Sequence, residues 1–317
     1  GVLQDLGLGV DYKHELDDAA ANIAAMLEAL RVDGEDRNAA EDANAEARLD
    51  IADELQAKWQ VQPGDLWQLG EHRLICGDCT DRTVIERVMG GEKAILLFTD
   101  PPYGVSYADK NKFLNSIGRG NCVQTNIVGD HQTPEEMSKF WESAFSSIRQ
   151  FMHPGAAYYV TGPQGGDLLL LLLLALRESG FPLKHMIIWA KNQFVIGRSD
   201  YHYQHEPVIY GWIDGAGHKF YGDRGESSLW QIDKPHSSDG HPTMKPVELY
   251  ERGIKNSSQP GEIIIEPFLG SGTGLIACQN LGRKCRGIEI EPKYVAVTLQ
   301  RWADATGGTP VRLENAE

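Results

Sequence analysis

The sequence predicts an α/β fold with a largely parallel sheet that is covered by helices on both faces. From residue 94 onward, short apolar runs of strand length alternate with helical segments. Such alternation is typical of parallel strands joined by crossover helices. In addition, a glycine-rich turn at 270–274 joins one apolar strand to a helix. Turns of this kind occur where open α/β sheets bind ligands, at the carboxyl ends of the strands.

The first predicted elements are two short strands, 66–69 and 73–75, which form a hairpin about Gly70. A helix over 82–89 and a buried apolar strand over 94–98 follow. Thr133 and Pro134 predict the start of a helix that runs to about residue 151.

A turn at Pro154-Gly155 and a strand over 156–160 come next. The leucine-rich run 168–176 is too short to span a membrane and predicts a buried helix that ends near Gly180. The later elements are strands at 184–189 and 206–212, a helix at 247–255, a strand at 262–265, a helix at 275–281 that ends at Gly282, and a strand at 285–290.

Composition places the chain among ordinary globular proteins. Of its net charge of −15, residues 1–60 supply −10, from 15 acidic and 5 basic residues. Any nucleic-acid contact must therefore come from a local basic surface. The five cysteines in 317 residues do not indicate a disulfide framework. Cys76 and Cys79 lack a second pair with zinc-ligand spacing, so we expect reduced thiols, no metal and a cytoplasmic location.

The chain divides into three parts. Residues 1–60 predict an acidic, partly helical linker or arm, with a dimerisation helix as the alternative. We expect the folded domain at 61–306 and a carboxyl-terminal tail at 307–317. The aromatic and histidine-rich stretch 192–240 is interpreted as a target-recognition insertion, although such segments also serve as packing loops.

The most informative stretch follows the strand that ends near residue 98. Asp100 is followed by Pro101, Pro102 and Tyr103, and two prolines cannot continue a ladder of hydrogen bonds. A carboxylate, a stiff corner with two carbonyl oxygens and an aromatic ring therefore lie at the ligand-binding edge. This corner suits an amino group on a planar ring. The alternative is a simple strand end with a surface tyrosine.

The carboxyl-terminal half carries a second site. Glu289 ends a strand 23 positions beyond Glu266, with the glycine-rich turn between them. This spacing is similar to a dinucleotide fingerprint, in which a carboxylate binds ribose hydroxyls. The start of the turn suits a ligand with an adenosine ribose and no phosphate, such as S-adenosylmethionine, and Thr243 and Lys245 are candidates for its carboxylate. The alternatives are a tight structural turn and a loop before a helix.

Together these motifs resemble the N4/N6 amino-methyltransferases of DNA, with the motifs in the permuted (beta) order, over residues 63–303. The resemblance implies a Rossmann-like, S-adenosylmethionine-dependent methyltransferase fold with a mostly parallel seven-stranded sheet. It also implies methyl transfer to an exocyclic amine of a base extruded from DNA. The motifs that carry it are 67–70, 76–78, 99–104, 188–191, 241–246, 266–273 and 287–289.

The resemblance also assigns roles to individual residues. Asp100 and a carbonyl oxygen of the proline corner accept hydrogen bonds from the target amine, and Tyr103 stacks on the base. Asp78 binds the adenine of the cofactor and Glu289 its ribose. Glu266 stands where the family usually has Asp, near the methionine amine. The remaining predicted cofactor contacts are Cys79, Thr243, Lys245, Pro267, Phe268, Gly270, Ser271, Gly272 and Thr273.

The expected partner is double-stranded DNA, without a membrane. A second copy of the chain and a cognate restriction endonuclease are further candidates, in a bacterial or phage nucleoid. Relatives of this subgroup often carry a ParB-like domain ahead of the catalytic domain, and residues 1–60 resemble the linker that follows it. The predicted DNA contacts, besides Tyr103, are Lys110, Lys112, Arg119, Lys191, Arg198, His202 and His205.

Three alternative functions remain open from the sequence. Asp at position 100 favours adenine N6 as the acceptor, since family members that act on cytosine N4 more often carry Ser there. RNA and protein-glutamine methyltransferases share a similar corner, but their cofactor motif normally precedes it, whereas here it follows. A non-catalytic module that binds S-adenosylmethionine or DNA is the third alternative.

Overall fold

The computed structural model describes residues 48–104, 133–194, 200–233 and 245–313, which belong to one compact unit. Several predictions therefore lie outside the described residues. They concern most of the acidic arm, the dimerisation helix, Lys110, Lys112, Arg119, Arg198 and Thr243.

In the described part of the chain, ten strands form one sheet in the order β10-β1-β2-β9-β8-β3-β4-β6-β5-β7. The strands are β1 (Leu66–Leu69), β2 (His72–Cys76), β3 (Ala94–Thr99), β4 (Met152–Thr161), β5 (Leu183–Ala190), β6 (His205–Trp212), β7 (Leu229–Gln231), β8 (Ile263–Glu266), β9 (Lys284–Glu289) and β10 (Val311–Leu313).

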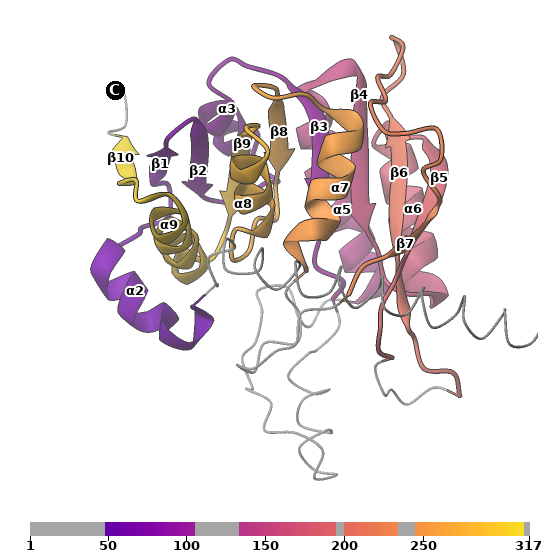
Figure 1. The fold of residues 1–317 in the computed structure, drawn as a ribbon, viewed down its shortest axis with the longest axis horizontal. Coiled ribbons are helices and arrows are strands. Elements are labelled where there is room, and N and C mark those ends of the chain that lie inside the picture. Colours follow the sequence, from indigo (N-terminus) through magenta and orange to yellow (C-terminus); the bar gives the residue numbers. More distant parts are fainter. Residues whose placement is uncertain (1–47, 105–132, 195–199, 234–244, 314–317) are drawn as a thin grey trace, which may run out of the picture. The chain divides into compact units, whose positions relative to one another are not determined.

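The seven strands from β2 to β5 in this order form the centre of the sheet (Figure 1). All of them run parallel except β6, which is antiparallel to both β4 and β5. The predicted mostly parallel sheet is confirmed. The predicted number of seven is too low, because β1 and β10 extend one edge and β7 extends the other.

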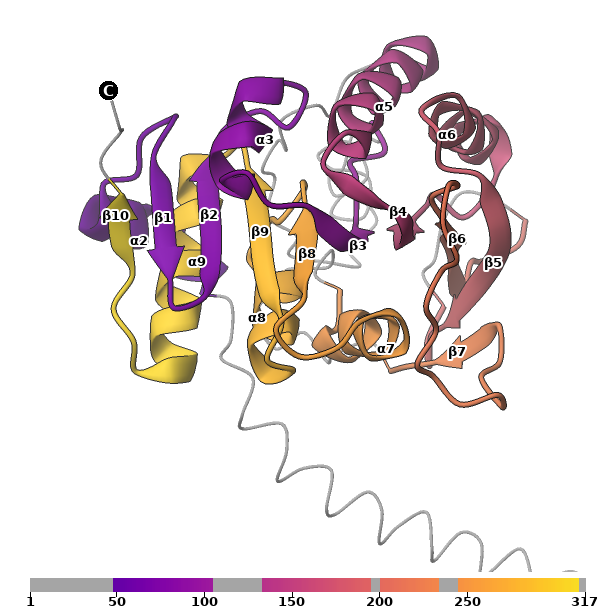
Figure 2. The same ribbon diagram turned by 90° about the horizontal axis from the view of Figure 1, so that it is seen from above.

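Helices cover both faces of the sheet (Figure 2). One face carries α3 (Arg82–Met89), α5 (Pro134–Arg149) and α6 (Gly166–Glu178). The other carries α7 (Val247–Ser257), α8 (Thr273–Asn280) and α9 (Pro292–Thr306). Two apolar cores result, one on each face. The predicted start of α5 is confirmed, because Thr133 and Glu136 form a reciprocal capping box.

Two local predictions are wrong. Pro154 and Gly155 lie within β4, where an irregularity in the pairing with β3 accommodates them, and not in a turn before it. The leucine-rich helix α6 is only half buried. Its positions Leu170 and Leu174 are 56% and 41% exposed, because a helix on one face of a sheet buries only one side.

The predicted domain boundaries also need correction. Helix α2 (Ala52–Trp59), preceded by a 3₁₀ turn at Leu49–Ile51, packs on α9, and Leu55 is buried in the core. The folded domain therefore includes residues before position 61. At the other end, β10 pairs with β1, so residues 311–313 belong to the sheet and not to a tail. Similarly, the stretch 192–240 contains β6, a central strand, so it is not an insertion as a whole.

Candidate active site at the carboxyl edge of the sheet

The two predicted halves of the site meet at one edge of the sheet. β3 pairs in parallel with β8, with Leu96 opposite Ile264 and Leu97 opposite Ile265. The residues that follow these strands, Asp100 and the Gly270 turn, therefore emerge side by side at their carboxyl ends. The expected juxtaposition of these two distant segments is confirmed.

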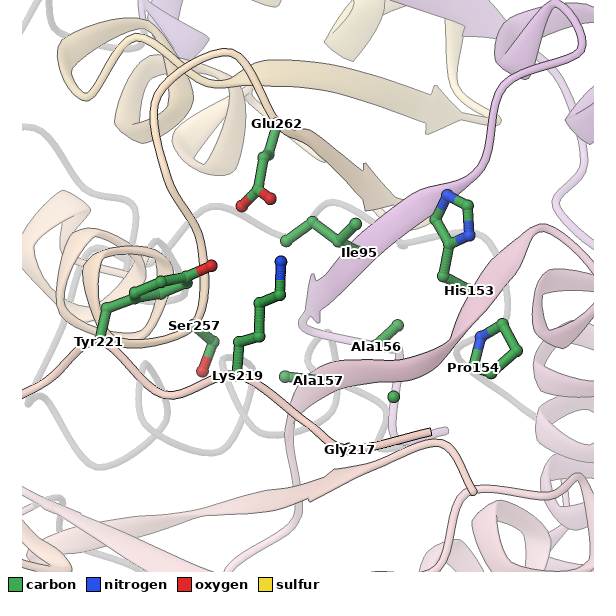
Figure 3. Close-up of a pocket in the computed structure, with 11 residues that line it drawn as sticks. Ile95, His153, Pro154, Ala156, Ala157, Gly217, Lys219, Tyr221, Ser257 and Glu262 are labelled. Carbon is green, nitrogen blue, oxygen red and sulfur yellow. The ribbon is translucent and has the colours of Figure 1, made fainter. Parts of the chain in front are cut away.

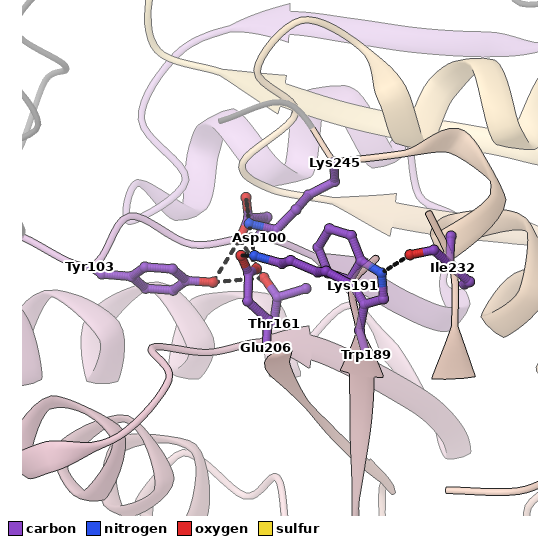
Figure 4. Close-up of polar contacts among 8 residues, drawn as sticks. All are labelled: Asp100, Tyr103, Thr161, Trp189, Lys191, Glu206, Ile232 and Lys245. Atoms are coloured by element: carbon purple, nitrogen blue, oxygen red, sulfur yellow. Dashed lines mark hydrogen bonds and ion pairs between the residues drawn. The ribbon is translucent and has the colours of Figure 1, made fainter. Parts of the chain in front are cut away.

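Asp100 lies in a cluster of hydrogen bonds and ion pairs just beyond the end of β3 (Figure 4). The Tyr103 hydroxyl donates to its Oδ1 at 2.7 Å, and the Thr161 hydroxyl donates to the same oxygen. The Lys245 ammonium lies 3.0 Å from its other oxygen, Oδ2. The carboxylate is one-quarter exposed, so it faces both the protein and solvent.

Tyr103 does not offer an open stacking surface in this structure. Its side chain is 8% exposed and belongs to the core beside β3. Its hydroxyl also lies 2.9 Å from Thr161 Oγ1. Burial, together with the charge of Asp100, raises the pKa of Tyr103 well above its usual value, so the phenol stays protonated and donates. The stacking of this ring on a base therefore stays a prediction, and in this structure the hydrogen bond to Asp100 holds the ring inward.

The proline corner is fixed from the opposite side by Trp141 on α5. Its indole N–H donates to the carbonyl oxygen of Pro102 at 2.9 Å. Of the two carbonyl oxygens that the sequence offered as acceptors, that of Pro101 is therefore the better candidate for an incoming amine. Trp141 was not predicted from the sequence, where it is an ordinary apolar position of an amphipathic helix.

Two predicted lysines have unexpected partners. Lys245, expected at the carboxylate of the cofactor, bridges Asp100 and Glu206, at 3.0 Å from an oxygen of each. Lys191, expected on DNA, is 7% exposed and pairs with the other oxygen of Glu206. Its ammonium lies 4.9 Å from the centroid of a ring of Trp189. Glu206 attracts both ammonium groups inward, although no motif in the sequence marks this residue.

Glu289 ends β9 close to the glycine-rich turn. Its carboxylate accepts from the backbone N–H of Gly270 and of Glu291, each at 2.8 Å. Burial raises its pKa to about 7, although these N–H groups favour the charged form. A methyl group built on Gly270, which has φ of +56°, would meet no atom of the described residues within 4 Å. Open space thus lies over the turn, beside a carboxylate that can accept hydroxyl groups.

Glu266 lies beneath this turn and not on it. The side chain is 1% exposed, and a Cβ on Gly274 would clash with its Oε2. The Tyr250 hydroxyl donates to Oε1 at 3.4 Å. Burial raises the pKa of Glu266 well above its usual value and so favours the neutral form of its carboxyl. The structure does not support the predicted contact with a ligand amine, because the side chain extends into the core against α8.

The glycine-rich turn is held by α9. The Arg301 guanidinium, which is 3% exposed, donates to the Ser271 carbonyl at 3.1 Å and to the Thr273 hydroxyl at 3.2 Å. The Thr298 hydroxyl donates to the Gly270 carbonyl at 3.2 Å. Arg301 and Thr298 are thus positioning residues that the sequence did not reveal, since they lie on a helix beyond the motif.

The other predicted cofactor residues surround the same edge. Asp78 is exposed after β2, next to Glu289, whose carbonyl accepts from the N–H of Gly77 at 2.9 Å. Phe268 is half buried, with its ring centroid 5.9 Å from that of Phe140. The residues Cys79, Pro267, Gly272 and Thr273 are buried, and Ser271 is partly exposed.

A group of exposed rings lies beyond the end of β5, at the same edge as Asp100. Phe194 and His202 stack with centroids 5.5 Å apart and planes 12° apart. Tyr203 and His205 meet edge to face at 5.8 Å. Tyr201 is 88% exposed. His202 and His205, two of the predicted DNA contacts, therefore lie in an accessible aromatic surface.

A cavity of about 300 Å³ lies at the opposite edge of the sheet (Figure 3). It is lined by the start of β3 at Ile95, by His153 and by Lys219 and Glu262. Asp100 follows the other end of β3, so this cavity is separate from the predicted site. In the described ranges, no cluster of three metal-ligating residues and no helix able to cross a membrane is found.

Comparisons with known proteins agree with this geometry. A family model described as DNA methylase, of the N6/N4 class, matches residues 95–300. The type II methyltransferase M2.DpnII of Streptococcus pneumoniae is 25% identical over 67% of this chain and 84% of its own length. The type II methyltransferase M2.MboI of Moraxella bovis is 24% identical over 67% of this chain and 81% of its own length.

Solved structures share the fold. The M1.HpyAVI complex with S-adenosylmethionine has a TM-score of 0.53 at 24% identity, over 72% of this chain and 97% of that one. The cytosine-N4-specific PvuII methyltransferase has a TM-score of 0.52 at 17% identity, over 74% of this chain and 89% of that one. Because the family model covers more than half of the sequence, the chain belongs to the N6/N4 DNA methylase family.

Proposed function

We propose that the protein transfers a methyl group from S-adenosylmethionine to the N6 amine of an adenine extruded from double-stranded DNA. The observation that carries this proposal is the position of Asp100, next to the proline corner and beside the glycine-rich turn on the neighbouring strand. Cytosine N4 is the alternative acceptor. The acidic residue at position 100 favours adenine.

The residues at the edge suit the donor. When bound, S-adenosylmethionine supplies a methyl group on a sulfonium. The carboxylate of Glu289 has unused lone pairs beyond its two backbone bonds, so it accepts from ribose hydroxyls. Asp78, on the adjoining strand end, is exposed and accepts from an adenine amine. Arg301 stabilises the conformation of the glycine-rich turn through its hydrogen bonds to Ser271 and Thr273.

The corner positions the acceptor. In the absence of a base, the Tyr103 and Thr161 hydroxyls occupy Asp100 Oδ1. The target amine replaces the Tyr103 hydroxyl at this oxygen and donates its second N–H to the Pro101 carbonyl. The Tyr103 ring then turns outward and stacks on the base. Two acceptors fix the direction of the amine, and such positioning lowers the barrier by removing rotational freedom before the reaction.

DNA contacts come from the aromatic surface at the same edge. Exposed rings stack on unpaired bases at about 1–3 kcal/mol per base. His202 and Phe194 already form a stacked pair and are well placed for this role. Lys110, Lys112, Arg119 and Arg198 remain proposed phosphate contacts. A second copy of the chain, a cognate endonuclease and a preceding ParB-like domain also remain proposals, as does the cytoplasmic location.

The test uses tritiated S-adenosylmethionine with the wild-type protein and duplex DNA of mixed sequence. After digestion to nucleosides, we expect the label in N6-methyldeoxyadenosine. Label in N4-methyldeoxycytidine would select the alternative acceptor, and label in protein or RNA would refute the proposal. Asp100→Ala should lose transfer but retain cofactor binding in calorimetry, because Asp100 faces the acceptor.

A further inference from the structure

Asp100 is the end of a buried chain of four alternating charges (Figure 4). Lys191 pairs with Glu206, Glu206 pairs with Lys245, and Lys245 pairs with Asp100. The side chains of Lys191, Glu206 and Lys245 are 5%, 10% and 11% exposed, respectively. Burying ions costs several kcal/mol each, and a fully apolar set is often as stable. A stabilising role alone therefore does not account for this arrangement.

The chain of charges joins two different parts of the sheet. Glu206 lies in β6 opposite Trp189 of β5, and Lys191 directly follows β5. Asp100 follows β3. Burial by itself raises the pKa of Glu206, but the two neighbouring ammonium groups lower it below the usual value. Glu206 is therefore ionised and holds the Lys245 ammonium in place.

We propose that Glu206 is a positioning residue for methyl transfer, acting through Lys245 on Asp100. This inference rests on the proposed role of Asp100. Glu206 fixes the ammonium of Lys245, which occupies Asp100 Oδ2. The carboxylate of Asp100 then keeps one orientation, in which Oδ1 faces the Tyr103 and Thr161 hydroxyls. Oδ1 is thereby the oxygen that receives the target amine.

The geometry distinguishes the two oxygens of Glu206. Oε1 pairs with the Lys191 ammonium, and Oε2 pairs with the Lys245 ammonium. In Glu206→Gln only one oxygen remains, so two ammonium groups compete for it and Lys245 is less firmly held. Removing Lys191 as well, in Lys191→Met/Glu206→Gln, leaves the remaining oxygen to Lys245. The double variant should therefore recover activity that the single variant lacks.

The experiment measures the single-turnover rate of label transfer to DNA at saturating cofactor, and the Kd for S-adenosylmethionine by calorimetry. For Glu206→Gln we expect a rate reduced about tenfold or more and a Kd changed less than about twofold, because misplacing an acceptor affects the reacting geometry and not the cofactor. The double variant should return to within about threefold of the wild-type rate. The rate of Lys191→Met alone is also measured, so that the four proteins form a double-mutant cycle.

The matched control is Glu92→Gln. Glu92 accepts from the buried Arg286 at 3.0 Å, but it precedes β3 and so lies at the opposite edge of the sheet. Its loss should leave the transfer rate unchanged. A general loss of stability would lower the rates of both variants together and give no recovery in the double variant, and that result would overturn the inference.

Two further outcomes are decisive. If wild-type protein labels no DNA, the proposed function fails and this inference fails with it. If Glu206→Gln transfers label at the wild-type rate, only this inference fails. Should Glu206→Gln not fold, Lys245→Met provides the second test. A lower rate with unchanged cofactor affinity supports the inference, whereas a matching loss of affinity places Lys245 on the cofactor and overturns it.

Discussion

Replacing Glu289 by Gln tests the cofactor half of the site in the most direct way. In the wild-type protein, both carboxylate oxygens accept a backbone N–H, from Gly270 and Glu291, at 2.8 Å. The amide of Gln keeps one acceptor oxygen, lacks the charge and turns an NH₂ group toward one of these N–H donors. A hydrogen bond to a charged group contributes about 1.5–3 kcal/mol. We therefore expect cofactor affinity about 10- to 150-fold weaker.

The pH dependence of cofactor affinity provides a second test of the role of Glu289. Ribose hydroxyls donate best to the ionised carboxylate, and burial raises the pKa of Glu289 to about 7. About nine-tenths of the protein is then competent at pH 8 and about one-tenth at pH 6. Wild-type affinity should be about tenfold weaker at pH 6 than at pH 8, since the apparent Kd scales inversely with the competent fraction.

Calorimetric titration with S-adenosylmethionine at pH 6, 7 and 8 gives both the cofactor affinity and its pH dependence. The Glu289→Gln variant should bind weakly with a flat pH profile. Glu178→Gln, on the exposed end of α6, should match the wild type at each pH. If Glu289→Gln binds with wild-type affinity, or keeps the wild-type pH dependence, Glu289 does not hold the ribose and the reasoning is wrong.

In the ligand-free protein, the effect of pH on folding stability should be opposite to its effect on cofactor affinity. The pKa of Glu289 in the folded state, about 7, is above its model value of 4.5. The carboxyl thus favours folding when it is protonated. This contribution is fully present below pH 4.5 and is lost as the pH rises through 7. The difference in melting temperature between wild type and Glu289→Gln should change accordingly between pH 5 and pH 8, with the wild type relatively more stable at low pH.

Three further predictions concern the positioning of the site and its DNA contacts. Arg301→Met should weaken cofactor binding and lower the free energy of unfolding by about 1–3 kcal/mol, because the partly buried Ser271 carbonyl loses its donor; calorimetry measures the first effect and thermal melts the second. Trp141→Phe, which loses the N–H to the proline corner, should lower the transfer rate about tenfold with unchanged cofactor affinity, and an unaltered rate would contradict this role. His202→Ala combined with Phe194→Ala should weaken DNA binding in fluorescence anisotropy by about 1–3 kcal/mol per stacked base, while equal affinity for DNA would exclude these rings from the interface.

Several features of the fold could be predicted because they follow from local chemistry. The helix over 82–89 has the predicted bounds, and Thr133 caps α5 as its side chain and the following residues indicated. Apolar runs of strand length marked β3 and β9 to within one residue at each end. Two prolines end β3 wherever it is placed, since neither can donate to a neighbouring strand. The proximity of Asp100 to the glycine-rich turn also followed, from the rule that parallel strands expose their carboxyl ends at one edge.

Tertiary structure alone decided which polar side chains meet. The sequence does not show that Glu206 faces Lys245 and Lys191, because their pairing depends on the antiparallel register of β5 and β6 and on the order of strands in the sheet. Lys191 is buried for this reason, although an isolated lysine after a strand is usually solvated. The carboxyl of Glu266 fits under the turn because α8 presents a glycine, Gly274, at the contact. Local preferences fixed where each element begins and ends, whereas long-range packing fixed the partners of each charge, since a buried ion pairs with whatever opposite charge the fold brings within reach.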